Sequence, residues 1–490
     1  MQNTCNITEF GAVGDNKTLN TSAFNNAINA VFDKGGGVLY VPPGKFLTGT
    51  IHLKSNVTLY LEAGVTIYGS INKEDYQQHC LIYGEDAVNV AVRGRGTIDG
   101  NGRGFFVKTD KGWERGPFRP LTFILKRCEN LMLEDFTLKN SGSWAIRPID
   151  CNRVTIRGLS LVNGNYELGG RNADGIDPDG CTNVRISDCY LETGDDAIVL
   201  KCTKNSQSGE CSNITVTNCV LKTSETALKI GSETYGDFKC ITFSNCSILD
   251  SGCGVGLWMR DGGLIDGWIV SNISMNVSPD FRRGGQAVYM WVYPRTDDIP
   301  CGTVKNVSIS NITARGDGGV FISGTPESHI DGVTLDNIRI TMRGDVRKEW
   351  HEDPPYPFYV WGHHRAPYDI FCRYVDDLKL RDVQYIWNEP EKPEWGSAIR
   401  CIEANNLIVD GFQGRQAVGS GKPAVELTKV KNALFRNCLA PEGTGTFLKI
   451  GEGCSHIGLM GNDFSYAEKV YEVKEAELDK EVFTSGNRTP

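Results

Sequence analysis

The sequence lacks long hydrophobic runs. No stretch of 18 or more consecutive apolar residues occurs, so no membrane-spanning helix is expected. The first ten residues, MQNTCNITEF, also lack the charged and then apolar pattern of a secretory leader. These absences predict a cytoplasmic protein with no membrane partner. The alternative is a periplasmic or secreted protein whose leader has been removed.

A basic excess is absent as well. The 51 Lys and Arg residues are outnumbered by 60 Asp and Glu residues, which gives a net charge of −9 at pH 7. Nucleic-acid binding proteins normally present a basic face, so no nucleic-acid partner is expected. An acidic substrate is still compatible with this charge, because a local basic cleft can lie on an acidic body.

The cysteines do not suggest a disulfide framework. There are 17 of them, an odd number, so at least one thiol is unpaired within the chain. Several recur at one place in related segments, as in ISDCYL, VTNCVL, FSNCSI and FRNCLA. This regularity favours free thiols that stack as small apolar core residues. Free thiols in turn favour a reducing compartment.

Linkers rich in Pro, Ser or Gly are missing too, but a repeat is present. NRVTIRGLSLVNG, TNVRISDCYLETG, SNITVTNCVLKTS and KCITFSNCSILDS begin near residues 152, 182, 212 and 239, and the spacing along the chain is 26 to 31 residues. Each repeat has β-branched residues at period two and a turn marked by Asn, Asp or Gly, without an amphipathic helix between repeats. Stacked short strands of this kind predict an all-β protein, a right-handed parallel β-helix, as one domain over residues 1–490.

The ends of such a solenoid must be covered. The segment NTSAFNNAINAVFDKGGG predicts an N-terminal capping helix over about residues 20–34, with Thr21 or Ser22 as the N-cap. The tail, about residues 466–490, is expected to cover the other end as a strand or a helix. The irregular stretch at about residues 345–375 is expected to form a long loop over the groove, where binding function often lies.

One segment departs from the repeat, GGRNADGIDPDGCTNVRISDCYLETGDDAIVLKC. Asp174 lies 21 residues before Asp195, close to one turn of the coil, so the two can stand on neighbouring turns. Adjacent strand residues point to opposite faces, so Asp195 and Asp196 share a cleft only if the chain bends, and Gly194 makes a bend low in strain. Three converging carboxylates raise at least one pKa by repulsion, which leaves a general acid beside ionised groups that activate water. Glycoside hydrolysis needs this arrangement.

A polar turn that closes one rung is the alternative interpretation of the GDD triplet, since Asp and Gly are turn residues. Asp177 and Asp179 are interpreted as turn residues for the same reason. The NADG segment one turn earlier and the basic residues Lys201, Lys229 and Arg260 favour the catalytic interpretation of the triplet.

NADGIDPDG followed by TGDDAIVLK resembles the signature of glycoside hydrolase family 28, the polygalacturonases and related pectin-degrading enzymes. FGAVGDNKTLNTSAFNNAI, GTIDGNG and IGSE resemble further family segments, so that the resemblance covers roughly residues 8–320. It implies that Asp195 is the general acid. It also implies that Asp174 and Asp196 hold and deprotonate the attacking water, with inversion at the anomeric carbon. Asn172 is implied to help fix the cluster.

Two departures from the family pattern concern the substrate contacts. The family usually has Gly-His-Gly before IGSE, but this sequence reads TSETALKIGSE, so Glu225 or Thr226 takes the place of the histidine. The family's Arg-x-Lys, which grips the galacturonate carboxylate, appears as GLWMRDGG, with Trp258 for the arginine and Arg260 for the lysine. An aromatic face suits the apolar side of a sugar ring, whereas arginine suits a carboxylate. We therefore expect a divergent member acting on a pectic or related plant-type glycan.

Further substrate-binding candidates rest on their positions in the chain. These candidates are Arg147, Lys201, Lys229, His363 and His364. The histidines lie in WGHHR, and their spacing lacks a matching acidic or Cys partner set, so neither a metal site nor a cofactor is predicted.

The sequence thus predicts a carbohydrate substrate and a glycoside hydrolase active in pectin degradation. Loops such as residues 103–120 are suited to wall off one end of the groove, which predicts cleavage from a chain end. Two other classes are considered. A polysaccharide lyase on the same scaffold would use Asp174, Asp195 and Asp196 as Ca²⁺ ligands. A non-catalytic glycan-binding β-helix would have no need for adjacent carboxylates.

Overall fold

A computed structural model describes residues 3–110, 112–164, 170–278, 285–342, 368–388 and 394–490. The chain forms two compact units. Unit 1 comprises Met1–Lys229 and Tyr235–Ile241, and unit 2 comprises Ile230–Thr234 and Thr242–Pro490. Both consist of parallel strands of a right-handed β-helix, which confirms the predicted fold class. The prediction of one domain over the whole chain stays a prediction.

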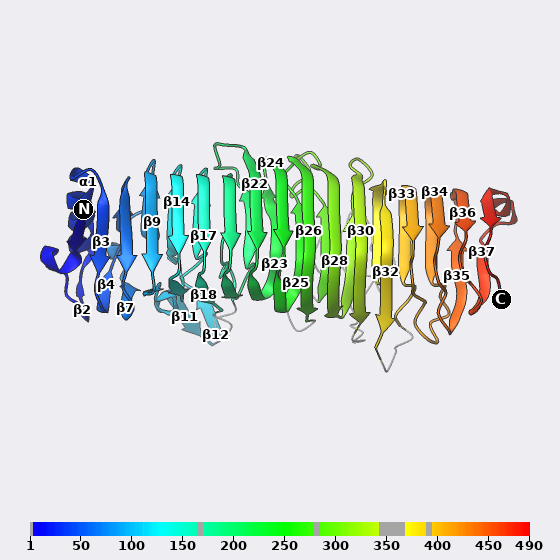
Figure 1. The fold of residues 1–490 in the computed structure, drawn as a ribbon, viewed down its shortest axis with the longest axis horizontal. Helices are drawn as coiled ribbons and strands as arrows, with labels where there is room; N and C mark the ends of the chain where they lie inside the picture. The colour runs from blue at the N-terminus through cyan, green and yellow to red at the C-terminus, as the bar shows by residue number, and fades with distance from the viewer. Residues whose placement is uncertain (1–2, 111, 165–169, 279–284, 343–367, 389–393) are drawn as a thin grey trace. The chain divides into compact units, whose positions relative to one another are not determined.

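Unit 1 has a first stack of parallel strands that follow one another along the chain (Figure 1). Residues of these strands alternate between buried and more exposed positions, as in Val57–Leu61, because successive side chains point to opposite faces. The stack contains β1 (Thr4–Asn6), β3 (Gly37–Val41), β6 (Val57–Leu61), β9 (Val88–Gly94), β14 (Glu129–Glu134), β17 (Asn152–Arg157), β19 (Thr182–Ser187) and β22 (Glu210–Thr217).

Two further stacks complete the coils of unit 1. The second contains β2 (Asp15–Leu19), β4 (Gly44–Thr48), β7 (Val65–Gly69), β10 (Thr97–Asp99), β15 (Thr137–Lys139), β18 (Ser160–Asn163), β20 (Tyr190–Thr193) and the start of β23 (Val220–Thr234). The third contains β5 (Ile51–Leu53), β8 (Cys80–Glu85), β13 (Leu121–Lys126), β16 (Ile146–Ile149) and β21 (Ile198–Cys202). Ile176 and Asp179 bridge β16 to β21, and thus bring the acidic segment into the third stack.

Asparagines in the left-handed region form a ladder at one turn of the coil. Asn56, Asn89 and Asn130 have φ values of 61°, 56° and 57°. The amide of Asn89 donates to Asn56 Oδ1 at 2.9 Å, and that of Asn130 donates to Asn89 Oδ1 at 2.8 Å. Asparagine tolerates this conformation better than most residues, which explains why it recurs at this turn in the sequence.

The recurrent cysteines also stack. The backbone N–H of Cys128 donates to Cys151 Sγ at 3.3 Å, and that of Cys151 donates to Cys181 Sγ at 3.4 Å. All three side chains are buried. They fill the narrow corner of the coil as small, weakly polar residues.

The N-terminal helix α1 (Thr21–Asp33) covers the first coils of unit 1 and packs against β1, β3 and β5. Its buried face is the predicted one, formed by Ala23, Phe24, Ala27, Ile28 and Val31. The predicted N-cap is wrong: Asn20 occupies that position, and Thr21 is the first helical residue. The Thr21 hydroxyl instead accepts a hydrogen bond from the Gly49 N–H at 2.7 Å, which ties the helix to a neighbouring turn.

One antiparallel hairpin is inserted into unit 1 after β10. The 3₁₀ helix η3 (Gly102–Phe105) leads into β11 (Phe106–Thr109), which pairs with β12 (Gly112–Arg115). The hairpin therefore lies in the predicted wall-forming stretch 103–120. Among the described residues of this unit, η1 (Ile7–Phe10) and η2 (Lys73–Asp75) are also 3₁₀ helices.

Unit 2 continues the parallel architecture with longer strands. Its asparagine ladder runs from Asn245 through Asn272 and Asn311 to Asn337, with amide hydrogen bonds of 3.0, 2.9 and 2.8 Å. One stack contains β26 (Leu264–Val277), β28 (Thr303–Gly316), β30 (Ile330–Met342) and β32 (Lys379–Trp387). The other contains β25 (Ser247–Met259), β27 (Gln286–Val292), β29 (Gly318–Ser323), β31 (Ile370–Asp376) and β33 (Ile399–Asp410).

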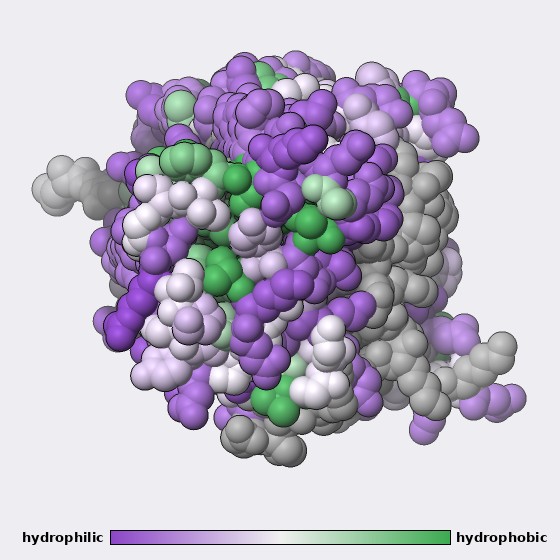
Figure 2. All heavy atoms as spheres, turned by 90° about the vertical axis from the view of Figure 1, so that its right-hand side faces the viewer, coloured by the Kyte–Doolittle hydropathy of each residue, from purple (hydrophilic) through white to green (hydrophobic). Residues whose placement is uncertain are grey.

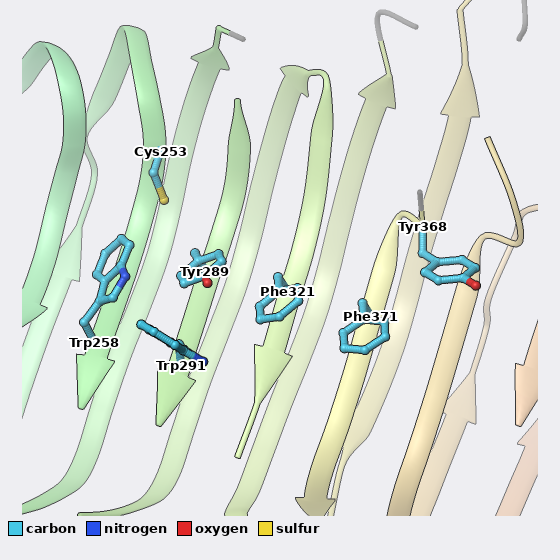
Figure 3. Packing of buried hydrophobic residues seen from close by; sticks show 7 residues of the cluster. All are labelled: Cys253, Trp258, Tyr289, Trp291, Phe321, Tyr368 and Phe371. Carbon is cyan, nitrogen blue, oxygen red and sulfur yellow. The ribbon is translucent and has the colours of Figure 1, made fainter. Parts of the chain in front are cut away.

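Aromatic rings stack along one face of β25, β27, β29 and β31, as Figure 3 shows. Trp258 lies on Tyr289 with ring centroids 5.1 Å apart, Tyr289 on Phe321 at 4.9 Å, and Phe321 on Phe371 at 5.1 Å. These four residues are named the aromatic stack here. Each is at most 3% exposed.

The C-terminal tail contains both of the predicted alternatives. Residues Ala467–Val473 form β37, Ala476–Glu481 the 3₁₀ helix η5, and Val482–Ser485 β38, which pairs with β36 (Ser455–Met460). The remaining strands of this region are β34 (Val425–Arg436) and β35 (Thr444–Ile450). Figure 2 faces this end of unit 2 and shows mainly hydrophilic atoms, with hydrophobic atoms in small separate groups. Because β37 and β38 pair with β35 and β36, the tail forms the last coil, and this end is mainly hydrophilic (Figure 2).

The predicted loop at about residues 345–375 lies mostly outside the described residues. Its predicted end is wrong, because Ile370–Asp376 forms β31 and pairs with β29 and β33. Within the described chain, no helix is both long and apolar enough to span a membrane.

Candidate active site

The two adjacent aspartates stand in a corner between strands. β20 ends at Thr193 and β21 begins at Ile198, so Asp195 and Asp196 occupy the bend that joins them. The predicted bend is confirmed, but the glycine before it serves a different purpose. A Cβ at Gly194 would lie 2.7 Å from the Cα of Gly170 on the preceding coil. Gly194 is therefore needed for the close approach of two coils rather than for a positive φ.

The corner brings three carboxylates together. Three carboxylate oxygens lie within 4.8 Å of one another, one each from Asp174, Asp195 and Asp196. Asp174 and Asp196 are each 3% exposed, and Asp195 is half-buried. The predicted convergence of these side chains is thus observed in unit 1.

Asp195 is held by backbone donors. Its Oδ2 accepts from the Asn172 N–H at 2.8 Å, and its Oδ1 accepts from the Asp196 N–H at 3.1 Å. Thr193 Oγ1 donates to the Asp195 carbonyl at 2.7 Å, and the Thr223 hydroxyl donates to the same oxygen. Asn172, at φ 58°, thus helps fix the cluster through its backbone.

Asp196 is paired with a buried lysine. Lys229 Nζ lies 2.5 Å from Asp196 Oδ2, and the two side chains are only 6% and 4% exposed. The Thr226 N–H donates to Asp196 Oδ1 at 3.2 Å. Lys229 and Thr226, both expected from the sequence to contact substrate, are therefore contacts of a cluster carboxylate.

Burial and mutual repulsion shift the acids of the cluster. Burial, then the charges of Asp196 and Glu225, raises the pKa of Asp195 to about 6. Burial, then the charges of Asp195 and Asp177, raises the pKa of Asp174 well above its ordinary value. The cluster therefore retains protons at a pH at which isolated carboxyl groups are ionised.

Two further aspartates lie near the cluster, and their interpretation as turn residues is wrong, because Asp179 bridges neighbouring strands and both side chains face cations. Asp177 and Asp179 are fully buried. Asp179 Oδ2 pairs with Arg147 Nη2 at 2.7 Å, and Asp177 Oδ1 lies 3.9 Å from Lys201 Nζ. Burial raises the pKa of Asp177 to about 8, since the opposing effect of Lys201 is smaller and the charge of Asp196 adds to the increase.

The ring of Trp144 lies against Lys201 and Arg147, the cations that face Asp177 and Asp179. No sequence pattern indicated Trp144 as part of the site. Lys201 Nζ lies 4.6 Å and Arg147 Cζ 4.9 Å from the centroid of its ring. Cation–π contact and the buried carboxylates together explain how charged side chains are tolerated here. Substrate binding by Arg147 and Lys201 stays a prediction.

The assignment of Glu225 or Thr226 to the place of the family's histidine stays a prediction. Both are buried, at 1% and 0% exposure. The Glu225 N–H donates to Thr223 Oγ1 at 3.1 Å, and its charge contributes to the raised pKa of Asp195. Glu225 therefore acts on the cluster through charge.

Trp258 and Arg260 lie in unit 2. Trp258 is 3% exposed and belongs to the aromatic stack, so its face towards Tyr289 is occupied by that ring (Figure 3). Arg260 Nε donates to the Tyr293 carbonyl at 3.3 Å, and its guanidinium lies 5.6 Å from the Trp291 ring. Binding of sugar by either residue stays a prediction. His363 and His364 lie outside the described residues.

Arg115 at the end of β12 and Arg119, four residues later, both contact Asn172, the residue whose backbone N–H holds Asp195. From the sequence, only the stretch 103–120 that contains them was expected to form a wall of the groove. Arg115 Nη1 donates to Asn172 Oδ1 at 2.7 Å, and Arg119 Nη2 donates to the same oxygen at 3.1 Å. These contacts join positions 57 and 53 residues apart. The only sequence signal is the group of arginines and aromatics in GWERGPFRP.

The donor set of the cluster also bears on the Ca²⁺ interpretation. Three carboxylates within 4.8 Å are of the ligand type that Ca²⁺ prefers. The Lys229 ammonium, however, already engages one oxygen of Asp196 and neutralises its charge. This pairing favours acid–base chemistry over cation binding by the cluster.

The profile of glycosyl hydrolases family 28 matches residues 36–353, and the chain belongs to this family. It is similar to a probable polygalacturonase of Vitis vinifera, at 33% identity over 217 residues that cover 40% of this chain and 43% of that protein. An exo-poly-alpha-D-galacturonosidase of Dickeya chrysanthemi is 27% identical over 252 residues, which cover 39% of this chain and 41% of that one. The chain thus spans less than half of each of these relatives.

A solved structure supports the fold. The hyperthermoactive exopolygalacturonase from Thermotoga maritima superimposes with a TM-score of 0.64 at 24% identity, covering 79% of this chain and 92% of that one. At this identity the likeness concerns the fold.

Proposed function

We propose that the protein is a glycoside hydrolase that cleaves glycosidic bonds of a pectic oligo- or polysaccharide from a chain end. The observation that carries the proposal is the convergence of Asp174, Asp195 and Asp196, whose carboxylate oxygens lie within 4.8 Å of one another in a largely buried corner. Polygalacturonase relatives from a plant and a bacterium, one of them named as exo-acting, support the substrate class.

In this proposal Asp195 donates a proton to the leaving glycosidic oxygen. With a pKa of about 6, it is protonated in a large fraction of molecules at mildly acidic pH. Asp196 and Asp174 orient and deprotonate the attacking water. Lys229 keeps Asp196 ionised through its contact of 2.5 Å, so that protonated and ionised carboxyl groups coexist in one corner.

Inversion at the anomeric carbon is part of the proposal. Inverting enzymes generally separate their carboxyl groups by about 6.5–9.5 Å. Here the nearest oxygens of the cluster lie within 4.8 Å. This shorter separation does not by itself favour a single displacement, which the proposal takes from the family resemblance, and the anomer of the first product measures it directly.

The inserted hairpin supports the exo-acting part of the proposal, because it contacts Asn172 and so stands beside the cluster at one side. Seventeen thiols, most of them buried, support a cytoplasmic location, where imported fragments rather than long polymers are the expected substrates.

The experiment is product analysis on a panel of pectic oligosaccharides, with the wild type beside Asp195→Asn and with and without chelator. We expect a saturated monosaccharide, released as the inverted anomer in early NMR spectra, and a loss of about 10²–10⁴-fold in rate for the variant. Loss of activity with chelator, together with an unsaturated product, would support the lyase instead. Random internal cuts in a long polymer would contradict the exo mode.

A further inference from the structure

The hairpin arginines form an unusual pair. Arg115 is exposed and ends β12, and Arg119 follows four residues later, half-buried. Both guanidinium groups donate to one neutral acceptor, Asn172 Oδ1, at 2.7 and 3.1 Å. Arg119 also donates to the carbonyls of Gly142 and Arg171, each at 3.2 Å.

The pair carries two positive charges at one place in the described part of the chain. Among the residues that the structure describes, neither arginine forms an ion pair with a carboxylate. The two guanidinium groups donate to one oxygen and therefore lie close together, and burial and the charge of Arg115 lower the pKa of Arg119. Arg127, by contrast, pairs with Glu85 at 2.6 Å and Asp86 at 2.7 Å. Two adjacent cations that share an amide oxygen leave several N–H donors for an anion.

The pair stands next to the proposed general acid. Asn172 receives the arginines on its side chain and donates its backbone N–H to Asp195 Oδ2 at 2.8 Å. Asp174 also acts on Arg119 through its charge. Asn172 alone therefore separates Asp195 from the two guanidinium groups, so a sugar whose glycosidic oxygen contacts Asp195 is bound close to both arginines.

We propose that Arg115 and Arg119 bind the carboxylate of a uronic-acid residue adjacent to Asp195 and thereby determine specificity for an acidic glycan. The inference rests on the proposed function, because it assigns the substrate of the same site. Guanidinium matches a carboxylate with two parallel N–H···O bonds, and such charge-assisted bonds are about twice as strong as neutral ones. The pair supplies cationic contacts at a place different from the family's Arg-x-Lys, which here contains Trp258.

The competing explanation is that the arginines only hold Asn172 in place. The two explanations differ in their dependence on the substrate's charge. A loss of positioning weakens an acidic and a neutral sugar alike, whereas a loss of carboxylate binding weakens only the acidic one.

The test measures binding by calorimetry in the full-length chain with Asp195→Asn, so that no cleavage interferes. The ligands are a trigalacturonate and its carboxyl-reduced, neutral counterpart. The changes added are Arg115→Gln, Arg119→Gln and, as a matched control, Lys108→Gln, which removes an exposed cation of β11 in the same hairpin. Wild-type activity on trigalacturonate is measured in parallel.

We expect each arginine change to raise the Kd for trigalacturonate by about tenfold or more, less so at high salt, while the Kd for the neutral sugar and the control change by less than about twofold. Equal losses for both sugars, unchanged binding, or no binding of trigalacturonate by the Asp195→Asn protein would overturn the inference. Arginine-dependent binding without hydrolysis by the wild type would overturn the proposed function and leave the inference standing. Hydrolysis by the wild type together with binding that does not depend on the arginines would support the proposed function and overturn the inference.

Discussion

Two buried strand faces, one in each unit, are built from opposite chemistry. In unit 1 the face around β21 and β23 carries Asp174, Asp177 and Asp196, each at most 3% exposed. In unit 2 the face of β25, β27, β29 and β31 carries the aromatic stack, which is buried to the same degree. Burial of aromatic rings stabilises the fold, and each stacked pair adds about 0.5–1.5 kcal/mol. Burial of carboxylates opposes folding unless they are paired or protonated.

The same coil architecture can therefore carry either apolar packing or a group of buried carboxylates. Where positions facing one way are filled by rings, they contribute stability that does not depend on pH. Where they are filled by carboxylates, the stability of the coil depends on protonation and on partners such as Lys229, and the raised pKa values are useful for catalysis. Such local conflict with packing is expected at functional sites.

Removal of the cation from the acidic face should have the largest effect. Lys229→Met leaves Asp196 buried without its ammonium partner, so we expect a loss of about 3–5 kcal/mol in the free energy of unfolding. Activity should fall as well, because the Asp196 carboxylate would lose the cation that faces it. Urea denaturation at pH 7 and initial rates measure the two effects.

The control for that change is Lys222→Met on the same strand. Its ammonium lies 3.0 Å from Glu192 Oε1, but the two side chains are 35% and 24% exposed, so a loss of about 0–1 kcal/mol is expected. Equal losses for the two lysines would mean that the buried pair has no special role.

Truncation within the aromatic stack sharpens the contrast. Phe321 lies between Tyr289 and Phe371 and is 2% exposed, so Phe321→Ala should lower the free energy of unfolding by about 3–5 kcal/mol. Urea denaturation at pH 5 and pH 8 should give the same loss, since no titrating group is removed.

Phe483→Ala serves as the control for this prediction. Phe483 is 60% exposed in β38, and its change should stay within about 0.5 kcal/mol. A loss for Phe321→Ala that varies strongly between the two pH values would contradict the assignment of this face to apolar packing alone.

Asp177→Asn tests the pH dependence of the acidic face. Because the folded pKa of Asp177 is raised to about 8, the unfolded chain releases this proton at lower pH than the folded chain does. This carboxyl group therefore lowers wild-type stability as pH rises from about 4 to 8. The variant should lack that decrease and gain stability relative to the wild type across this window. Denaturation midpoints at pH 4, 6 and 8 measure the gain.

Asp188→Asn, the same substitution at an exposed position, provides the matched control. A wild-type minus Asp177→Asn difference that is constant from pH 4 to pH 8 would show that Asp177 is ionised in the fold.

The smallest effect is expected at the asparagine ladder of unit 2. Asn272 has φ 56° and accepts from and donates to its ladder neighbours, but it is exposed to solvent. Asn272→Ala should lower the free energy of unfolding by about 1–2 kcal/mol, and Asn272→Gly by less, because glycine tolerates the positive φ. Thermal unfolding of both variants separates the backbone contribution from that of the amide.

Local patterns were sufficient to predict much of this structure. The β-helix follows from the repeat, and the buried face of α1 follows from its helical periodicity. The convergence of Asp174 with Asp195 and Asp196 follows from a spacing of 21 residues, close to one coil. Each of these predictions depends on residues near in sequence or separated by one coil.

Contacts across many residues could not be predicted in the same way. Arg115 reaches Asn172 over 57 residues through a hairpin whose path is not encoded by the repeat. Trp258 stacks on Tyr289 and Asp179 pairs with Arg147 across adjacent coils, but the repeat alone does not specify the register that brings these particular side chains together. The predicted N-cap of α1, Thr21 or Ser22, lies one or two residues after the observed Asn20, because Asn, Thr and Ser are all suitable caps and stand side by side.

Successive asparagines of the unit 1 ladder stand at unequal intervals in the sequence. Asn56 and Asn89 are 33 residues apart and Asn89 and Asn130 are 41 apart, yet their amide hydrogen bonds are nearly equal in length. The longer interval contains the hairpin β11–β12. Extra residues between two ladder positions can therefore form a hairpin while the turns that carry the coil stay in register. New substrate preferences in such proteins can thus arise by gain or loss of whole segments as well as by exchange of single residues.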